Sequence, residues 1–183
     1  MRGFTGPFGV FVRSYAYMRM WGPRLREMSE AAVLNANYVL ARLKDAYDLP
    51  FDRLCMHEFV LSARTLKREH GCTALDVAKR LMDYGFHPPT IYFPLIVPEA
   101  LMVEPTETEA KETLDAFCDG MLAIAREAAE EPALLKEAPH HRPVKRLDEV
   151  RAAKHPVVKY GFEEHPAAEG EALSAVAEAP KGA

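Results

Sequence analysis

The chain has 183 residues, of which 49% are hydrophobic and 27% charged, and its formal net charge at pH 7 is −4. This composition is typical of a globular protein with a buried core, and it excludes collagen-like, rod-like and disulfide-rich scaffolds. The negative excess lies in residues 163–183, where Lys181 stands against five glutamates. Because no Lys/Arg cluster is interleaved with aromatic residues, the sequence favours no nucleic-acid partner.

The cysteines and the apolar runs indicate the compartment. Cys55, Cys72 and Cys118 are widely spaced, without a Cys-x-x-Cys motif or a Cys/His spacing that suits zinc. They are predicted to be reduced, partly buried thiols. The sequence shows no apolar run long enough for a membrane span and no secretory signal at its start. We therefore expect a cytoplasmic protein that has no membrane partner.

Two helices are predicted in the first part of the chain. Segment 10–20 (VFVRSYAYMRM) carries apolar or aromatic residues on nearly every face, so we expect it to pack on several sides. Gly22 and Pro23 interrupt it. Residues 25–47 contain no glycine or proline and place apolar residues at helical spacing, which predicts a long, mostly covered helix that ends before Pro50.

The hydrophobic period then changes from that of a helix to that of a strand. Residues 54–61 (LCMHEFVL) are short and rich in large apolar side chains, which predicts a buried strand. A helix should follow and reach Tyr84, because Thr73 and Asp76 have the spacing of a capping box and Gly85 stands where the helix should end.

Residues 90–93 and 101–103 are predicted to be two further strands that return on each other as a hairpin. Thr106 and Glu109 have the spacing of a second capping box, so the next helix should begin there and end near Pro132. The order of elements predicts an α+β fold with a small, mostly antiparallel sheet covered by helices. Without a GxGxxG or GxxxxGK[ST] motif, a doubly wound nucleotide-binding sheet is disfavoured.

Three polar side chains are candidates for a ligand site. In His87-Pro88-Pro89-Thr90 two prolines fix the backbone at the start of a strand, and a rigid loop with an imidazole and a hydroxyl suits a ligand carboxylate or phosphate. A plain turn is the alternative reading. His57 and Glu58 are neighbours on a predicted strand and therefore point to opposite faces; His57 either belongs to the core or edge, or lines a cleft at the end of the sheet.

Other chemistry has little support in the residues. His140 and His141 are adjacent and lack a third ligand at a suitable spacing, so no metal site is predicted. The acidic run 104–109 is explained by the first turn of a helix, where the helix dipole favours carboxylates. No serine or cysteine lies in the context of a catalytic nucleophile.

Five segments keep an order and spacing that match one known family over most of residues 6–162. They are GVFVRSYAY at 9–17, AVLNANY at 32–38, MHEFV at 56–60, DVAKRLMDYGFHPPT at 76–90 and LMVEPTETE at 101–109. With them the chain resembles the C-terminal part of glycine dehydrogenase (decarboxylating), the P-protein of the glycine cleavage system, in the form of subunit 2 of the two-subunit type.

The resemblance implies the small C-terminal domain of a fold-type-I pyridoxal-phosphate enzyme. In this family glycine loses its carboxylate with the help of pyridoxal phosphate, and the aminomethyl group passes to the lipoyl arm of the H-protein. The implied partners are subunit 1, the lipoylated H-protein, glycine and the chain's own N-terminal large domain. That domain should hold most of the cofactor, including its lysine, and is missing from this sequence. We therefore expect a fragment that is inactive in isolation.

The residue patterns and the resemblance together divide the chain. The resemblance implies that residues 1–23 lie at the junction with the missing domain, ahead of the α+β domain at 24–131. The prolines and the composition predict an irregular wrapping segment at 132–162, with a short helix near 147–153, and a disordered acidic tail at 163–183. His87 and Thr90, in the motif GFH-PT, are the first candidates to line the substrate and lipoyl channel, and His57 is the second. No catalytic residue is expected in this segment, and its cofactor contacts stay unassigned.

Two other functions are compatible with the same residues. One is a free-standing, non-catalytic binding module derived from this domain, which offers its surface to a lipoyl group or a partner protein. The other is the small domain of a different pyridoxal-phosphate enzyme of the same fold, such as a decarboxylase or desulfurase; the long ordered match argues against it.

Overall fold

The structure is a computed structural model that describes residues 5–159. It divides into two units, 1–139 and 140–183, which are described separately. The acidic segment 163–183, predicted to be disordered, lies outside the described residues. Among the described residues, none of the helices combines the length and apolar character needed to cross a membrane.

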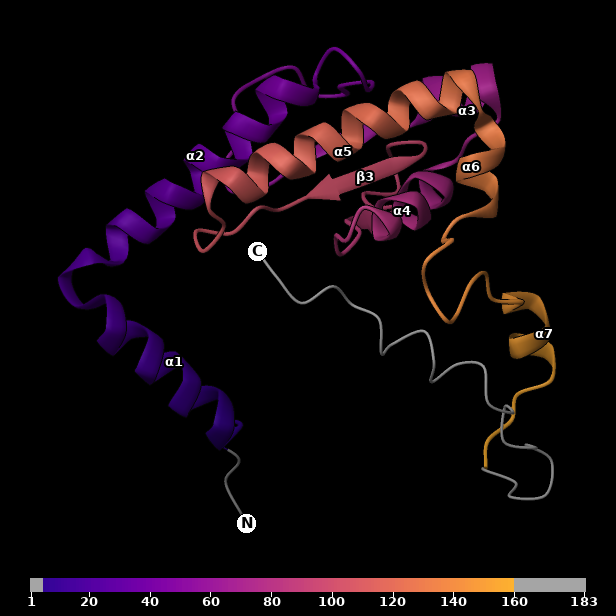
Figure 1. Cartoon of the computed structure of the whole chain (residues 1–183). Coiled ribbons are helices and arrows are strands. Elements are labelled where there is room, and N and C mark those ends of the chain that lie inside the picture. Colours follow the sequence, from indigo (N-terminus) through magenta and orange to yellow (C-terminus); the bar gives the residue numbers. More distant parts are fainter. Residues whose placement is uncertain (1–4, 160–183) are drawn as a thin grey trace, which may run out of the picture. The chain divides into compact units, whose positions relative to one another are not determined.

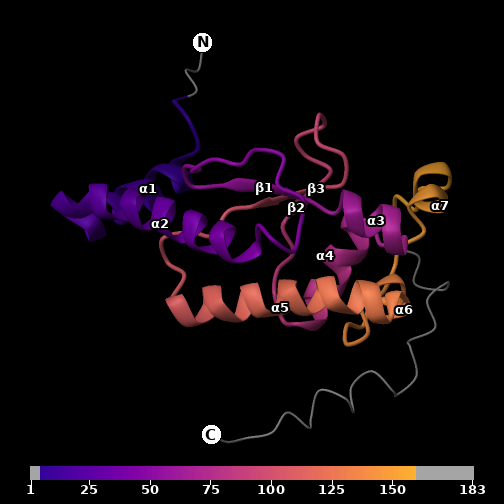
Figure 2. The ribbon, with the colours of Figure 1, turned by 90° about the horizontal axis from the view of Figure 1, so that it is seen from above.

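The first unit combines helices with one small sheet (Figures 1 and 2). Its elements are α1 (Phe8–Trp21), η1 (Gly22–Arg24), α2 (Leu25–Leu43), β1 (Phe59–Ser62), α3 (Arg64–His70), α4 (Ala74–Asp83), β2 (Thr90–Ile91), β3 (Ala100–Val103), α5 (Lys111–Glu130) and α6 (Pro132–Glu137). The second unit contains α7 (Glu149–Lys154). The predicted α+β class is confirmed. Sequence analysis missed α3 and α6.

The sheet has the strand order β1-β3-β2, and both pairs of strands are antiparallel. Leu61 lies opposite Leu101, and both are fully buried. Alternate residues of a strand share a face, so this pair marks the face of the sheet that covers the core. Thr90 of β2 lies opposite Met102 of β3, which confirms the predicted hairpin, although β2 is only two residues long.

Helix α5 is the centre of the core. It packs against α2, α3, α4 and α6. Cys118, Met121 and Ile124 are fully buried at a spacing of three residues, which is the spacing of one face of a helix. Burial of a large apolar side chain stabilises a fold by roughly 1.5–3 kcal/mol, so this face contributes a large share of the stability of the unit.

The predicted capping box of α4 is confirmed. Thr73 Oγ1 accepts a hydrogen bond from the amide of Asp76 (3.3 Å), and Asp76 Oδ2 accepts one from the amide of Thr73 (2.7 Å). The helix ends at Asp83 with Tyr84 as its C-cap, and Gly85 follows with φ = +86°, a conformation that favours glycine.

The second predicted capping box is wrong. Helix α5 begins at Lys111, and its N-cap residue Ala110 offers no side-chain hydrogen bond. The backbone of Thr106 instead binds α2. The side-chain amide of Asn35 on that helix donates a hydrogen bond to the Thr106 carbonyl (2.8 Å). This tertiary contact keeps the segment that contains Thr106 and Glu109 outside the helix.

The strand predicted at 54–61 is also mostly wrong, because β1 begins only at Phe59. The preceding residues form a loop in which the side chains of Leu54 and Met56 are 87% and 71% exposed. Asn37 on α2 explains this conformation. Its side-chain amide donates to the Cys55 carbonyl (2.8 Å) and accepts from the Cys55 amide (3.0 Å), so these backbone groups are not available to a strand partner.

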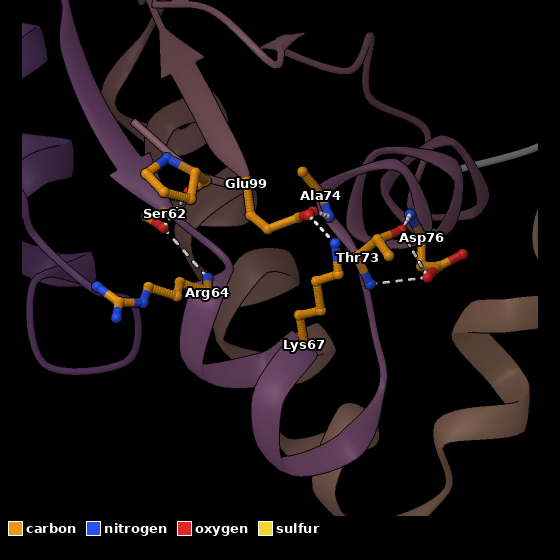
Figure 3. Close-up of polar contacts among 8 residues, drawn as sticks. Ser62, Arg64, Lys67, Thr73, Ala74, Asp76 and Glu99 are labelled. Atoms are coloured by element: carbon orange, nitrogen blue, oxygen red, sulfur yellow. Dashed lines mark hydrogen bonds and ion pairs between the residues drawn. The ribbon is translucent and has the colours of Figure 1, made fainter. Parts of the chain in front are cut away.

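A polar cluster joins the sheet to α3 and α4 (Figure 3). The carboxylate of Glu99 is 10% exposed and accepts hydrogen bonds from the Ala74 amide (2.8 Å) and from Lys67 Nζ (2.5 Å). Glu99 has φ = +53°, and its carbonyl accepts a hydrogen bond from the Ala63 amide (2.9 Å). The dipole of α4 favours a carboxylate at this end. Glu99 thus fixes the start of β3.

Helix α1 contrasts with the packed part of the unit, since none of its residues is buried. Its side chains reach the rest of the unit through a hydrogen bond from the Tyr17 hydroxyl to Glu107 and through the Trp21 ring, which lies 5.6 Å from the Arg24 guanidinium of η1. Within the described residues, therefore, α1 does not have the cover on several sides that its sequence predicts.

Candidate functional site

A pocket of about 360 Å³ lies where the β2–β3 hairpin meets the first turns of α5. Three chain segments form it: the loop before β2, the end of β3 with the residues that follow, and residues 109–117. We call it the hairpin pocket. Its lining residues are Phe86, His87, Pro88, Pro89, Thr90, Met102, Val103, Glu104, Pro105, Glu109, Thr113, Leu114 and Phe117. The structure therefore brings His87 and Thr90 together, as two members of one lining.

The loop that carries His87 is anchored on both sides. Before it, Phe86 packs edge-on against Phe117 of α5, with ring centroids 5.5 Å apart and an interplanar angle of 86°. After it, two prolines restrict the backbone, and Thr90 enters the sheet opposite Met102. The side chains of His87 and Thr90 themselves are exposed. A rigid backbone thus presents two polar groups to whatever enters the pocket.

His57 lies in a neighbouring pocket of about 330 Å³, which α2 lines on one side. We call this the α2 pocket. Glu104 and Pro105 line both pockets, so they form the wall between them. His57 Nε2 is 4.0 Å from Glu104 Oε1, and both side chains are 55% exposed. His57 lies in the loop before β1, and not on a strand as predicted. It lines a different pocket from His87 and Thr90, and the two pockets share only Glu104 and Pro105.

Sequence analysis missed two residues that build these walls. Asn37 holds the loop that carries His57, and Asn35 holds the segment that follows Glu104, through the hydrogen bonds described above. Their involvement in hydrogen bonds could have been predicted from the sequence, because amide side chains on the covered part of a helix need hydrogen-bond partners. The identity of the partners depended on chain segments distant in sequence.

The charge of the hairpin pocket differs from what the loop sequence suggested. Its lining contains two carboxylates, Glu104 and Glu109, and no lysine or arginine. A carboxylate or phosphate ligand would meet like charges there, so the pocket disfavours it.

Two groups of ion pairs lie on the flanks of α5. On one flank, hydrogen bonds from Lys111 and Tyr38, with Arg42 Nη1 at 2.7 Å, lower the pKa of Asp115 to about 2. On the other flank, Arg80 and Tyr84 donate to Glu127 at 2.6–3.0 Å, and the hydrogen bond from Arg80 lowers the pKa of that carboxyl. These pairs join α5 to α2 and α4, so their role is structural.

The cysteines are also structural. Cys55, Cys72 and Cys118 are free thiols; Cys55 is partly buried, and Cys72 and Cys118 are buried. Desolvation raises the pKa of the Cys118 thiol to about 11, so at neutral pH it is protonated and a poor nucleophile.

The residues that line the two pockets do not suit the expected cofactor. Neither lining contains a lysine that could bind pyridoxal phosphate covalently. Two lysines near the sheet and α5, Lys67 and Lys111, are engaged with Glu99 and Asp115. Within residues 5–159 no group of three or more His, Cys, Asp and Glu side chains is placed to hold a metal ion. We therefore derive no cofactor chemistry from this chain.

Several known proteins are similar to this chain over most of its length. Residues 28–141 match the family model described as glycine dehydrogenase, C-terminal domain. Over 161 residues the chain is 58% identical to the probable glycine dehydrogenase (decarboxylating) subunit 2 of Listeria innocua. The matched residues are 87% of this chain and 33% of that protein. Proteins of the same name from Bacillus velezensis and Staphylococcus saprophyticus are 58% and 56% identical over 161 residues, which is 87% of this chain and 33% and 32% of theirs. The chain thus spans about a third of the length of the curated relatives it matches.

Proposed function

The chain belongs to the glycine dehydrogenase C-terminal domain family, and from this premise we propose that it acts as the C-terminal segment of a glycine dehydrogenase (decarboxylating) subunit 2. The identity of 58% over 161 residues to a protein of that name is the observation that carries the proposal. The complete enzyme would work in the cytoplasm with subunit 1, decarboxylate glycine and pass the aminomethyl group to the lipoyl arm of the H-protein.

We assign pyridoxal phosphate to the large domain of the complete protein. When bound, the cofactor serves as the electron sink that makes loss of the glycine carboxylate possible. The lysine-free linings of the two pockets support this division of labour, because neither lining offers an amine that could bind the cofactor covalently.

We propose that His87, Thr90 and His57 line the channel through which glycine and the lipoyl arm reach the cofactor. The fixed backbone around His87 and Thr90 supports a role in orientation, since a rigid wall holds reactants in one geometry without reacting with them. His57 contributes from the α2 pocket, on the other side of the wall that contains Glu104.

A chimera tests the proposed function. Residues 5–159 replace the matching third of the Listeria innocua subunit 2, and the product is combined with subunit 1 and lipoylated H-protein. Release of carbon dioxide from carboxyl-labelled glycine is then measured. We expect turnover within roughly tenfold of the parent enzyme, which corresponds to about 1.4 kcal/mol in the barrier. A chimera that folds and binds pyridoxal phosphate without releasing carbon dioxide would instead support a non-catalytic binding module.

Substitutions in the chimera test the site residues. His87→Ala should lower kcat/KM by about 100-fold, the effect expected when a positioning contact is lost, and Thr90→Val and His57→Ala by less. Glu130→Gln, on the exposed end of α5, serves as the control that leaves turnover unchanged. Wild-type kinetics in all three site variants would remove these residues from the channel.

The division of labour has its own test in the isolated chain. The chain is incubated with pyridoxal phosphate, reduced with borohydride and digested, and the modified lysines are mapped by mass spectrometry. Absent labelling, or labelling scattered over exposed lysines, is the expected result. Stoichiometric labelling of one lysine, with protection by glycine, would show a cofactor site in this chain and refute the assignment.

A further inference from the structure

We propose that Asn37 of α2 is a positioning residue that acts through His57 and so fixes one side of the α2 pocket. This inference rests on the proposed function, in which His57 lines the channel. Asn37 lies one helical turn after Val33, which lines the α2 pocket, but it is not itself part of the lining. Asn37 can therefore act on a bound molecule only through the chain segment that it holds.

The side-chain amide of Asn37 uses both of its hydrogens and its oxygen. Nδ2 donates to the Val33 carbonyl and to the Cys55 carbonyl, each at 2.8 Å, and Oδ1 accepts from the Cys55 amide at 3.0 Å. A side-chain amide nitrogen carries two hydrogens, so no donor is left over. The bond to Val33 lies within α2 and orients the amide, which then presents one donor and one acceptor to the backbone of Cys55.

The loop between α2 and β1 depends on this contact for its position. Among residues 5–159, the hydrogen bonds that reach residues 51–58 from another element both come from Asn37. The side chains of Phe51, Leu54 and Met56 are exposed, so packing restrains them little. Cys55, the residue that Asn37 binds, is packed against the core. The loop is thus held at one residue, by an amide from the neighbouring helix.

His57 follows the held residue by two positions in the sequence. Two residues of chain span at most about 7 Å, so a fixed Cys55 confines the backbone of His57 to a small volume. His57 Nε2 lies 4.0 Å from Glu104 Oε1, in another segment of the same lining. Asn35 holds that segment through the Thr106 carbonyl. Two side chains, two residues apart on one helix, therefore fix both segments that line the pocket beside α2.

Helix α2 provides a firm base for this contact. Ala36 and Val39 on either side of Asn37 are fully buried, and α2 packs against α5. The amide of Asn37 thus ties the position of an exposed histidine to the position of the core. A fixed wall orients a reactant without reacting with it. Loss of Asn37 should therefore affect turnover through the position of His57 and by no other route.

The first measurement uses the full chain and involves no turnover. Asn37→Leu keeps the approximate volume of the side chain and removes all three hydrogen bonds. Amide NMR relaxation should give His57 an order parameter of about 0.85 in the wild type and below about 0.6 in the variant. Asn35→Leu is the matched control, which should loosen Thr106 and leave His57 rigid.

A second variant guards against a loss of folding. Asn37→Asp keeps the shape and the acceptor of the side chain and removes both donors, so it should loosen His57 as well. Unchanged amide shifts in α5 show that a variant is folded. If His57 stays as rigid as in the wild type in the folded variants, or is already mobile in the wild type, the proposal is overturned.

The second measurement is a double-mutant cycle in the chimera. Asn37→Leu should lower kcat/KM about tenfold, to the same extent as His57→Ala. The double variant should lose no more than either single variant, because the two residues act as one unit. Combination with His87→Ala, in the hairpin pocket, should multiply the two losses. A purely structural role of Asn37 would multiply with both histidine variants and would overturn the proposal.

The two measurements separate this inference from the proposed function. An active chimera in which the losses from Asn37→Leu and His57→Ala multiply would refute the positioning role alone. A chimera without turnover would refute the proposed function, and the order parameter of His57 in the full chain would then decide the positioning role. A loosened His57 supports that role, and a rigid one overturns it.

Discussion

Helices α1 and α5 are both rich in apolar residues, yet the structure treats them in opposite ways. Helix α5 buries one face, with Met121 and Ile124 fully covered, whereas α1 buries none of its residues and leaves the side chain of Phe8 80% exposed. The sequence of α5 confines its apolar residues to a stripe that one core can cover. The sequence of α1 distributes them around the helix.

A helix that is apolar on all sides is stable in water only when other surfaces cover it. Among the described residues, α1 packs against α2, and its Tyr17 hydroxyl donates a hydrogen bond to Glu107. Most of the surface of α1 is left exposed. The apolar content of a helix therefore predicts that other surfaces will cover it. The distribution of the apolar residues around the helix predicts on how many sides.

The largest difference between the two helices should appear in stability. Ile124→Ala on α5 should lower the free energy of unfolding by about 2–5 kcal/mol, because it leaves a cavity in the core. Val12→Ala on α1, where the side chain is 49% exposed, should change it by less than about 0.5 kcal/mol. Urea denaturation followed by circular dichroism measures both. Similar losses in the two variants would break the comparison.

The ion pair between α4 and α5 should have the next largest effect. Glu127→Gln should cost about 1–2 kcal/mol at neutral pH, since Arg80 loses a charged partner and both side chains are only partly exposed. Because the Arg80 hydrogen bond lowers the pKa of Glu127, the stabilisation is complete above the usual glutamate pKa of 4.5 and is lost as the pH falls below it.

Denaturation at several pH values tests this sign. The gap between the unfolding free energies of wild type and Glu127→Gln should stay constant down to the usual glutamate pKa of 4.5 and narrow as the pH falls below it. Glu130→Gln on the same helix is exposed and should show no gap at any of these pH values. A gap that widens in acid would contradict the assigned direction.

The two threonines with capping-box spacing provide a smaller and more selective test. Thr73→Ala removes a side-chain cap from α4 and should cost about 1 kcal/mol. Thr106→Ala should cost less than about 0.5 kcal/mol, because Thr106 is held through its backbone carbonyl and caps no helix. Thermal unfolding distinguishes them, and equal losses would mean that Thr106 does cap α5.

The smallest effect on stability is expected at the surface of α1. Replacement of Phe8, Phe11 and Tyr15 by serine should change the unfolding free energy by less than about 0.5 kcal/mol, since all three side chains are more than half exposed. The same change should reduce both the binding of an apolar dye and the self-association of the isolated chain, because it removes an exposed apolar patch. A wild-type chain that is monodisperse and binds no dye would show that the apolar side chains of α1 are not exposed in solution.

The sequence predicted best where local chemistry decides structure. The capping box at Thr73, the glycine after α4 and the amphipathic stripe of α5 all follow from contacts within a few residues. The prediction failed at residues 54–58 and at Thr106, where Asn37 and Asn35 of α2 bind backbone groups of distant segments. Helical and strand propensities carry no information on such partners.

For the candidate site, the sequence by itself determined which loop is rigid and which residues it offers, because proline restricts the backbone wherever it stands. The family, too, could be identified from the order of short motifs. Only the tertiary structure decided that Glu104 and Glu109 line the same pocket as His87, and that His57 lines the neighbouring α2 pocket. The charge of a pocket is the sum over segments that folding brings together, so it could not be derived from any one of them.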